Sequence, residues 1–149
     1  MTTSMNAPAD TDVMQLAPYI FFYGRCEEAL EFYKTALGGT YELQRNAEMP
    51  AEMNHGVPAD WRNKVMHSTF KAPGITFMAS DGRDAKPVDP DGGNISLGLA
   101  APDRTAGERV FKALSQGGNV TMPMDDAFWG GRFGIVQDRF GNEWLLTSP

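Results

Sequence analysis

Residues 18–39 read PYIFFYGRCEEALEFYKTALGG, and this stretch sets the order of a strand, a helix and a glycine stop. The run Leu16–Phe22 is rich in aromatic and aliphatic residues, which is typical of a strand. Apolar residues then recur at helical spacing, at Cys26, Ala29, Leu30, Tyr33 and Leu37. Gly38 and Gly39 end the helix, because glycine takes the left-handed conformation at little steric cost.

The same order recurs in the second half of the chain, where Gly117 and Gly118 stand 79 residues after the first glycine pair. The strand predicted over Asn94–Ala100 precedes a second helix, and Thr105 with Glu108 fits a capping box at its start. The buried stripe of this helix is expected to consist of Val110, Phe111 and Leu114.

Three short strands are predicted after each helix, bounded by Gly, Pro, Asn or Asp. They cover Thr40–Arg45, Lys64–Lys71 and Ile75–Ser80 in the first half, and Asn119–Met124, Arg132–Asp138 and Asn142–Ser148 in the second. The sequence therefore predicts an α+β protein in which a βαβββ module occurs twice.

The domain organisation follows from this repeat. Residues 1–13 are expected to form a flexible tail, and residues 14–149 a single domain. That domain consists of a module over 14–82, a turn-rich linker over 83–92 and a second module over 93–149. A long connection over 46–63, which contains His55, is either a binding loop or a solvated segment.

Composition limits the partners. The net charge of −6 disfavours nucleic acid and anionic membranes, which both bind basic patches. No apolar run approaches the roughly 20 residues of a membrane span. The chain has one cysteine, Cys26, so it forms no internal disulfide, and we expect a cytoplasmic location. Because Cys26 lies on the apolar stripe, we expect core packing in preference to thiolate reactivity.

Several phrases, spread in order from residue 17 to residue 144, resemble PhnB-like proteins of the glyoxalase/bleomycin resistance/dioxygenase (vicinal oxygen chelate, VOC) superfamily. They are PYIFFYGRCEEALEFYKTALGG, KVMHSTF, ITFMASDG, GNISLGL, GGNVTMPMDDAFWGGRFG and DRFGNEW. The resemblance implies an eight-stranded open cup with helices outside, a small-molecule ligand on the concave face and a homodimer. Relatives are often labelled 3-demethylubiquinone-9 3-methyltransferase, but no glycine-rich loop of a cofactor-binding methyltransferase is evident, so methyltransferase activity is not expected.

Metal-using members of this superfamily bind a divalent ion through one residue from the first and one from the last strand of each module. Counting along the matching phrases places these positions at Pro18, Met78, Asn94 and Leu146. None is a strong ligand for a hard divalent ion. A shift by one residue to Tyr19, Ile95 and Leu145 is no better. We therefore expect no metal and no other cofactor.

The remaining site residues are candidates for ligand contact. Alternation over Asn94–Leu99 predicts that Asn94, Ser96 and Gly98 line the cup while Ile95, Leu97 and Leu99 meet the helix. Met78 is placed in the cup by the resemblance. His67, expected on the same strand face as Val65 and Thr69, is either a general base or ligand contact or a hydrogen-bonded residue of the sheet.

Trp129 and Arg132 lie on either side of Gly130 and Gly131, and the pair could close over a planar or anionic ligand. The alternative is structural: Trp129 packs at a module or dimer interface, and Arg132 pairs with Asp125 or Asp126. Methionines 49, 53, 122 and 124 either line an adaptable apolar pocket or serve ordinary packing.

Two functional hypotheses remain open. In the first, the chain is a PhnB-like protein of undefined substrate that binds a small molecule without a metal. In the second, it is a VOC enzyme, of lyase or isomerase type, whose chemistry has moved to His67, Arg132 or a carboxylate such as Glu48. Turnover separates them, because a binding protein gives stoichiometric protection and no product.

Overall fold

The computed structural model describes residues 13–50, 57–82 and 93–149 of the 149-residue chain. The chain separates into two compact units, Met1–Pro87 and Val88–Pro149. The predicted tail (apart from residue 13), the predicted linker over 83–92, and His55 with Met53 lie outside the described residues. Within the described residues, no helix is long and apolar enough to cross a membrane.

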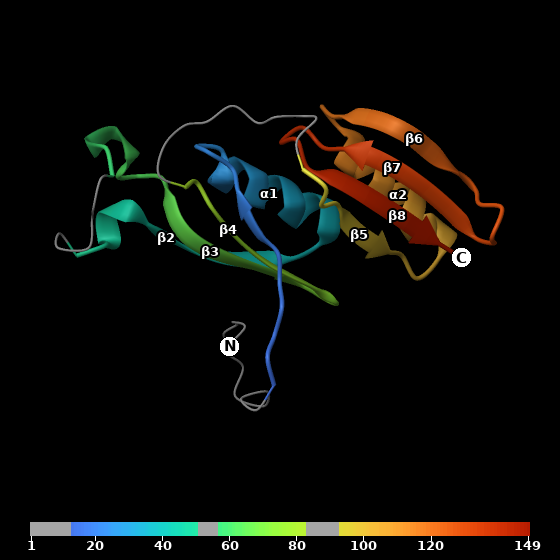
Figure 1. Ribbon diagram of the computed structural model, residues 1–149, viewed down its shortest axis with the longest axis horizontal. Helices are drawn as coiled ribbons and strands as arrows, with labels where there is room; N and C mark the ends of the chain where they lie inside the picture. The colour runs from blue at the N-terminus through green and yellow to red at the C-terminus, as the bar shows by residue number, and fades with distance from the viewer. Residues whose placement is uncertain (1–12, 51–56, 83–92) are drawn as a thin grey trace. The chain divides into compact units, whose positions relative to one another are not determined.

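The first unit has the predicted βαβββ order (Figure 1). Its elements are β1 (Tyr19–Phe21), α1 (Cys26–Leu37), β2 (Thr40–Arg45), β3 (Val65–Ala72) and β4 (Ile75–Ser80), with short 3-10 turns at Asn46–Glu48 and Ala59–Trp61. The strands form one mixed sheet in the order β1-β4-β3-β2, in which β1 runs parallel to β4 and the other neighbours are antiparallel.

Helix α1 covers one face of this sheet through the stripe that the sequence predicts. Cys26, Ala29, Leu30 and Tyr33 have no exposed surface. The helix ends at Gly38, which has the left-handed φ of 74° and donates its N–H to the Lys34 carbonyl, as predicted. Aromatic rings from β3 and β4 (Phe70 and Phe77) complete the core of the module, with Tyr33 edge-on to Phe77.

The second unit repeats the pattern. Its elements are β5 (Leu97–Ala100), α2 (Arg104–Ser115), β6 (Asn119–Asp126), β7 (Arg132–Gln137) and β8 (Glu143–Ser148). The sheet order is β5-β8-β7-β6, again with one parallel pair, and α2 packs on β6, β7 and β8. Buried Phe111 and Leu114 carry the predicted stripe of the helix. The α+β class and the two βαβββ modules are therefore confirmed.

The predicted capping box of the second helix is wrong. Asp103 is the N-cap, and its carboxylate accepts the N–H of Ala106, whereas Thr105 already lies inside the helix. Asp in extended conformation directly before the helix is an efficient cap, so Thr105, two residues later, is not at the N-cap position that a capping box requires. Glu108 instead pairs with Arg132.

The first strand of each module is shorter than predicted. β5 begins at Leu97, which is paired with Trp144, because its partner β8 begins only at Glu143. Asn94 and Ser96 therefore precede the strand and are exposed. Of the apolar set, Leu97 and Leu99 lie in register with buried Trp144 and Leu146 as expected, whereas Ile95 is 83% exposed.

Candidate functional site

Each sheet has one face covered by its own helix, and we call the other its open face. On the first sheet, the register puts Tyr19 of β1 beside Met78 of β4 and Met78 beside Thr69 of β3. Their strand neighbours Phe70, Phe77 and Ala79 are buried. Because side chains alternate along a strand, residues Tyr19, Phe21, Glu42, Gln44, His67, Thr69, Lys71, Thr76 and Met78 share the open face.

A polar aromatic pair stands on this face. The Tyr19 hydroxyl lies 3.2 Å from His67 Nδ1, and the ring centroids are 5.7 Å apart. Tyr19 is 40% exposed and Phe21 49% exposed, so both rings reach solvent. Phe21 lies 5.2 Å from Tyr19 and 6.1 Å from Tyr23 between ring centroids, which extends the pair into an aromatic row at the sheet edge.

The structure corrects one detail of the prediction for His67. Val65 is fully buried, whereas His67 is only half-buried, so the two do not share one environment. The cause is a register shift between Gln44 and Arg45, which pair with His67 and Val65 and leave Met66 as an extra residue. Thr69 does share the face of His67, as predicted.

The aromatic row is fixed at one end by Asp81, a residue that the sequence analysis missed. Its buried carboxylate accepts the N–H of Gly24 and of Cys26, both at 2.8 Å, and of Val65 at 2.7 Å. The turn it holds contains Tyr23, whose φ of 49° is left-handed. The Asp-Gly pair at 81–82 reads as an ordinary turn, so only the three-dimensional contacts reveal its role.

The second sheet carries different residues at the equivalent positions. Gly98 is in register with Leu145 as Tyr19 is with Met78, and Leu145 is also paired with Ile135. The predicted ligand position Leu146 is wrong: Leu146 is fully buried on the helix side, because it lies one residue out of phase with the open face. Leu145 occupies the open-face position and offers no donor atom.

The metal-ligand positions predicted on the first strand of each module, Pro18 and Asn94, also lie outside β1 and β5. Pro18 precedes β1 and contributes only its carbonyl, which accepts the Met78 N–H at 2.9 Å. Within the described residues, no group of three or more His, Cys, Asp or Glu side chains could hold a metal ion. Tyr19, Met78, Gly98 and Leu145 therefore do not fit the divalent site that the superfamily uses.

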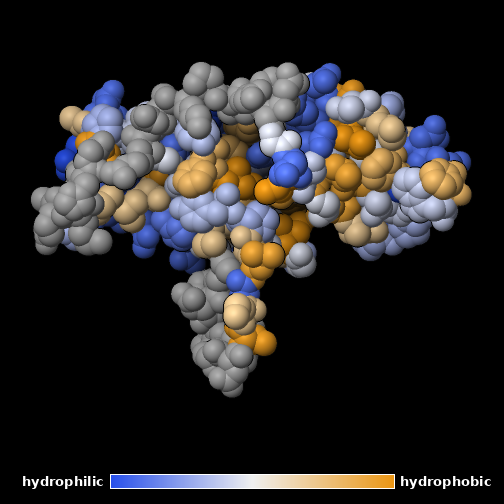
Figure 2. Space-filling model, viewed as in Figure 1, coloured by the Kyte–Doolittle hydropathy of each residue, from blue (hydrophilic) through white to orange (hydrophobic). Residues whose placement is uncertain are grey.

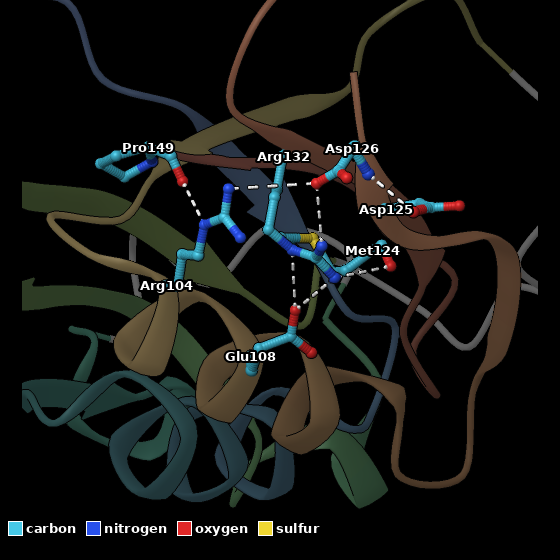
Figure 3. Close-up of polar contacts among 7 residues, drawn as sticks. All are labelled: Arg104, Glu108, Met124, Asp125, Asp126, Arg132 and Pro149. Atoms are coloured by element: carbon cyan, nitrogen blue, oxygen red, sulfur yellow. Dashed lines mark hydrogen bonds and ion pairs between the residues drawn. The ribbon is translucent and has the colours of Figure 1, made fainter. Parts of the chain in front are cut away.

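Arg132 and Trp129 do not act together, because Arg132 is the first residue of β7 and bonds to groups near α2, whereas Trp129 lies in the turn before that strand and packs on Phe133. Arg132 lies in register with buried Ser148 and turns toward α2 (Figure 3). It donates to Glu108 Oε2 at 3.0 Å, to Asp126 Oδ1 at 3.2 Å and to the Met124 carbonyl at 3.1 Å. The hydrogen bonds and charges of Glu108 first, and of Asp126 second, raise the pKa of Arg132. This arrangement favours the structural alternative.

Trp129 turns instead toward Phe133, with ring centroids 5.5 Å apart, and remains 61% exposed beside the nearly fully exposed Phe128. The two glycines that follow do not give the loop freedom. A backbone hydrogen bond from Ala127 to Gly131 closes the turn, and Gly131 has a φ of 72°. Trp129 is thus an aromatic side chain on a closed turn, with its ring free to contact a ligand.

We expect Arg132→Ala to lower the melting temperature by several degrees, because the variant leaves Glu108, Asp126 and the Met124 carbonyl without their donor. Arg104→Ala is the matched control, since Arg104 contacts the same Asp126 only at 4.0 Å and donates to the Pro149 carbonyl. Circular dichroism melts measure both. An unchanged melting temperature for Arg132→Ala would show that the arginine is dispensable for stability.

The weaker candidates are Cys26, Glu48 and the two methionines of β6, and their surroundings are as follows. Burial first, then the charges of Asp81 and Glu27, raise the pKa of the Cys26 thiol to about 12, against the opposing effect of the hydrogen bond with Ser68. The thiol therefore stays protonated near neutral pH, as core packing implies. Glu48 accepts the Arg45 N–H at 2.9 Å. Met122 lies exposed on β6, and Met124 packs near Gly134.

Comparison with known proteins agrees with this fold. A family model described as 3-demethylubiquinone-9 3-methyltransferase matches residues 14–147. The crystal structure of protein PA1353 from Pseudomonas aeruginosa is similar at 36% identity and a TM-score of 0.78, over 91% of this chain and 98% of that one.

Two further structures are similar. A putative 3-demethylubiquinone-9 3-methyltransferase, PhnB protein, from Bacillus cereus is 25% identical with a TM-score of 0.73, over 91% of this chain and all of that one (100%). A member of the glyoxalase/bleomycin resistance protein/dioxygenase superfamily from Sphaerobacter thermophilus is 23% identical with a TM-score of 0.54, over 91% and 98%. The last likeness concerns the fold alone.

Proposed function

Since this chain belongs to the family described as 3-demethylubiquinone-9 3-methyltransferase, the PhnB-like branch of the glyoxalase/bleomycin resistance/dioxygenase superfamily, we propose that it binds a small molecule without a divalent metal. The ligand lies on the open face of the first sheet. One observation carries this proposal: the hydrogen-bonded Tyr19–His67 pair stands on that face with exposed aromatic surface beside it. Ligand sites combine apolar area with a few polar groups in this way.

The proposal departs from the methyltransferase in the family's description. Among the described residues, the parallel strand pairs are β1–β4 and β5–β8. The segment between β1 and α1 contains a single glycine, Gly24, where a nucleotide-type cofactor loop would need several. These features support binding over methyl transfer.

The experiment is a ligand-observed NMR screen of small aromatic compounds, aromatic acids and antibiotics against the wild-type protein. Compounds that bind are then titrated against His67→Ala and Tyr19→Ala, with Phe128→Ala as the matched control on an exposed aromatic of the second unit. We expect both first-sheet variants to weaken binding about tenfold and the control to leave it unchanged. The proposal would be refuted if no compound bound at millimolar concentration. It would also be refuted if binding were lost only in the control variant Phe128→Ala.

A metal analysis tests the metal-free part of the proposal. We expect less than about 0.1 equivalent of Mg, Mn, Fe, Ni or Zn per chain after purification without chelator, because Met78 and Leu145 offer no hard donor atom. Mass spectrometry of the digested protein measures this. About one equivalent of any of these metals would contradict the prediction.

An enzyme with a relocated site is the second candidate function. The observation that favours it is the partly exposed imidazole of His67 next to a phenol, since imidazole is the usual general base near neutral pH. Product formation in excess over protein, abolished by His67→Ala, would establish catalysis. Stoichiometric protection of the ligand without product would establish binding.

We also propose that the protein is a homodimer. Residues 13–17 extend away from the first sheet (Figure 1), and Met14 and Leu16 on this segment are fully exposed. Hydrophobic surface is visible on the segment that projects from the molecule (Figure 2). A second copy of the chain would cover them. We expect light scattering at micromolar concentration to give twice the chain mass of 16.3 kDa, and Met14→Ser with Leu16→Ser to reduce it. A single-chain mass for the wild type would exclude the dimer.

A further inference from the structure

We infer that the molecule bound on the open face of the first sheet is a neutral, planar aromatic compound with a hydrogen-bond acceptor, such as a carbonyl oxygen, at its edge. This inference rests on the proposed function and names the chemical class of its ligand. Three features of the described residues carry it: the aromatic row, the donor that His67 presents, and the balance of charge on the face.

The aromatic row favours a flat ligand. Tyr19, Phe21 and Tyr23 follow one another at alternate positions along the sheet edge, with centroid separations of 5.2 Å and 6.1 Å. Phe21 and Tyr23 are close to parallel, at 27°, and Phe21 keeps half of its surface exposed. Stacking on such rings is worth more to a planar π-system than to a saturated ring of equal size.

The hydrogen-bond pattern favours an acceptor on the ligand. A phenol is the stronger donor of the pair and an imidazole nitrogen the stronger acceptor, so Tyr19 donates its O–H to His67 Nδ1. In a neutral imidazole the proton then resides on Nε2. Nε2–H is then the donor that this pair offers to a ligand on the open face, and a carbonyl oxygen is its natural partner.

The charges on this face favour a neutral ligand. The charged side chains at its described positions are Glu42 and Lys71, which lie on adjacent strands at diagonal positions and oppose each other in sign. No arginine occupies an open-face position of the four strands described. A carboxylate or phosphate would find no fixed guanidinium there, and the net charge of −6 would repel it.

The second sheet lacks this combination. The register equates Tyr19 with Gly98, Phe21 with Ala100 and His67 with Phe133. Its open face therefore offers no aromatic row along the first strand and no imidazole donor. The two modules share a fold, but the chemistry that recognises a planar acceptor is present in the first.

The test uses coumarin as the probe, because it is planar, neutral and carries a ring carbonyl. Octahydrocoumarin keeps the carbonyl without the aromatic ring, and coumarin-3-carboxylate adds a negative charge. Isothermal titration of the full chain is expected to show that coumarin binds at least about tenfold more tightly than either comparison compound. Equal affinity for octahydrocoumarin would overturn the stacking argument, and tighter binding of the carboxylate would overturn the argument for a neutral ligand.

Two variants assign the contacts. His67→Phe keeps a ring and removes the N–H, and Phe21→Leu removes a stacking surface; each should weaken coumarin binding about tenfold, while Phe128→Leu leaves it unchanged. Melting curves confirm that the variants fold. If His67→Phe does not fold, Tyr19→Phe replaces it as the test, because without the Tyr19 hydroxyl the tautomer of His67 is no longer fixed. Coumarin affinity that survives these substitutions would overturn the inference. If other compounds bind and depend on Tyr19 and His67, the proposed function stands without this ligand class; if nothing binds there, both fail.

Discussion

Replacement of Asp81 by alanine is expected to reduce the free energy of unfolding by about 3–5 kcal/mol, because three backbone N–H groups, two of them buried and one part-buried, lose their acceptor and a buried one costs about 1–3 kcal/mol when left unsatisfied. The three donors belong to Gly24, Cys26 and Val65, and Asp81 itself is 1% exposed. Native proteins are stable by only about 5–15 kcal/mol, so this loss would be a large fraction of the total.

The effect should be local in origin as well as large. Gly24 and Cys26 lie on the turn that carries Tyr23 in its left-handed conformation, so the variant also releases one end of the aromatic row. Asp103→Ala is the matched control, because Asp103 accepts a single N–H at the exposed start of α2 and its loss should cost about 1 kcal/mol. Urea unfolding followed by circular dichroism measures both. Equal losses for the two variants would refute the role assigned to Asp81.

Replacement of Gly118 by alanine is expected to cost about 3 kcal/mol, the upper part of the range for overpacking, and to lower the melting temperature by roughly 10 °C. A Cβ atom at Gly118 would lie 2.2 Å from the Gln137 carbonyl oxygen and 3.0 Å from Asp138 Cα. These are backbone atoms that cannot rotate away, so the β6–β7 pair would have to separate.

Gly38→Ala is the control for this prediction. Gly38 has a φ of 74° but nothing within 4 Å of the added carbon, so alanine should cost only the left-handed penalty of about 1–2 kcal/mol. Gly39, the counterpart of Gly118, would place a Cβ 2.5 Å from the Lys71 carbonyl oxygen and should resemble Gly118. Thermal melts that rank Gly38→Ala as the most damaging of the three would contradict this account.

The same glycines show how far the sequence could predict the fold. The Gly-Gly pairs marked both helix ends, and the stripe from Cys26 to Tyr33 identified the buried face of α1, because these signals depend on residues near in sequence. The second glycine of each pair has another role, close approach to a facing strand, which depends on a partner distant in sequence. Periodicity therefore predicted the elements but not this contact.

The candidate site was predicted only in part. His67 and Met78 do lie on the open face, but Leu146 does not, since an error of one residue moves a strand side chain to the opposite face. Arg132 directly follows a glycine pair and was open to either assignment. Its partner Glu108 lies on α2 and could not be inferred from adjacent residues. The Tyr19–His67 contact joins residues 48 apart and needs the β1–β4–β3 register.

An NMR titration of the ¹⁵N-labelled protein with the tightest binder from the ligand screen tests the central claim most directly. Our account predicts that the largest shift changes occur at the His67 ring nitrogens and at the amides of Tyr19, Phe21 and Met78, on the open face of the first sheet. Changes of this size confined to Trp129 and Phe133 of the second unit, with the His67 ring unaffected, would contradict it.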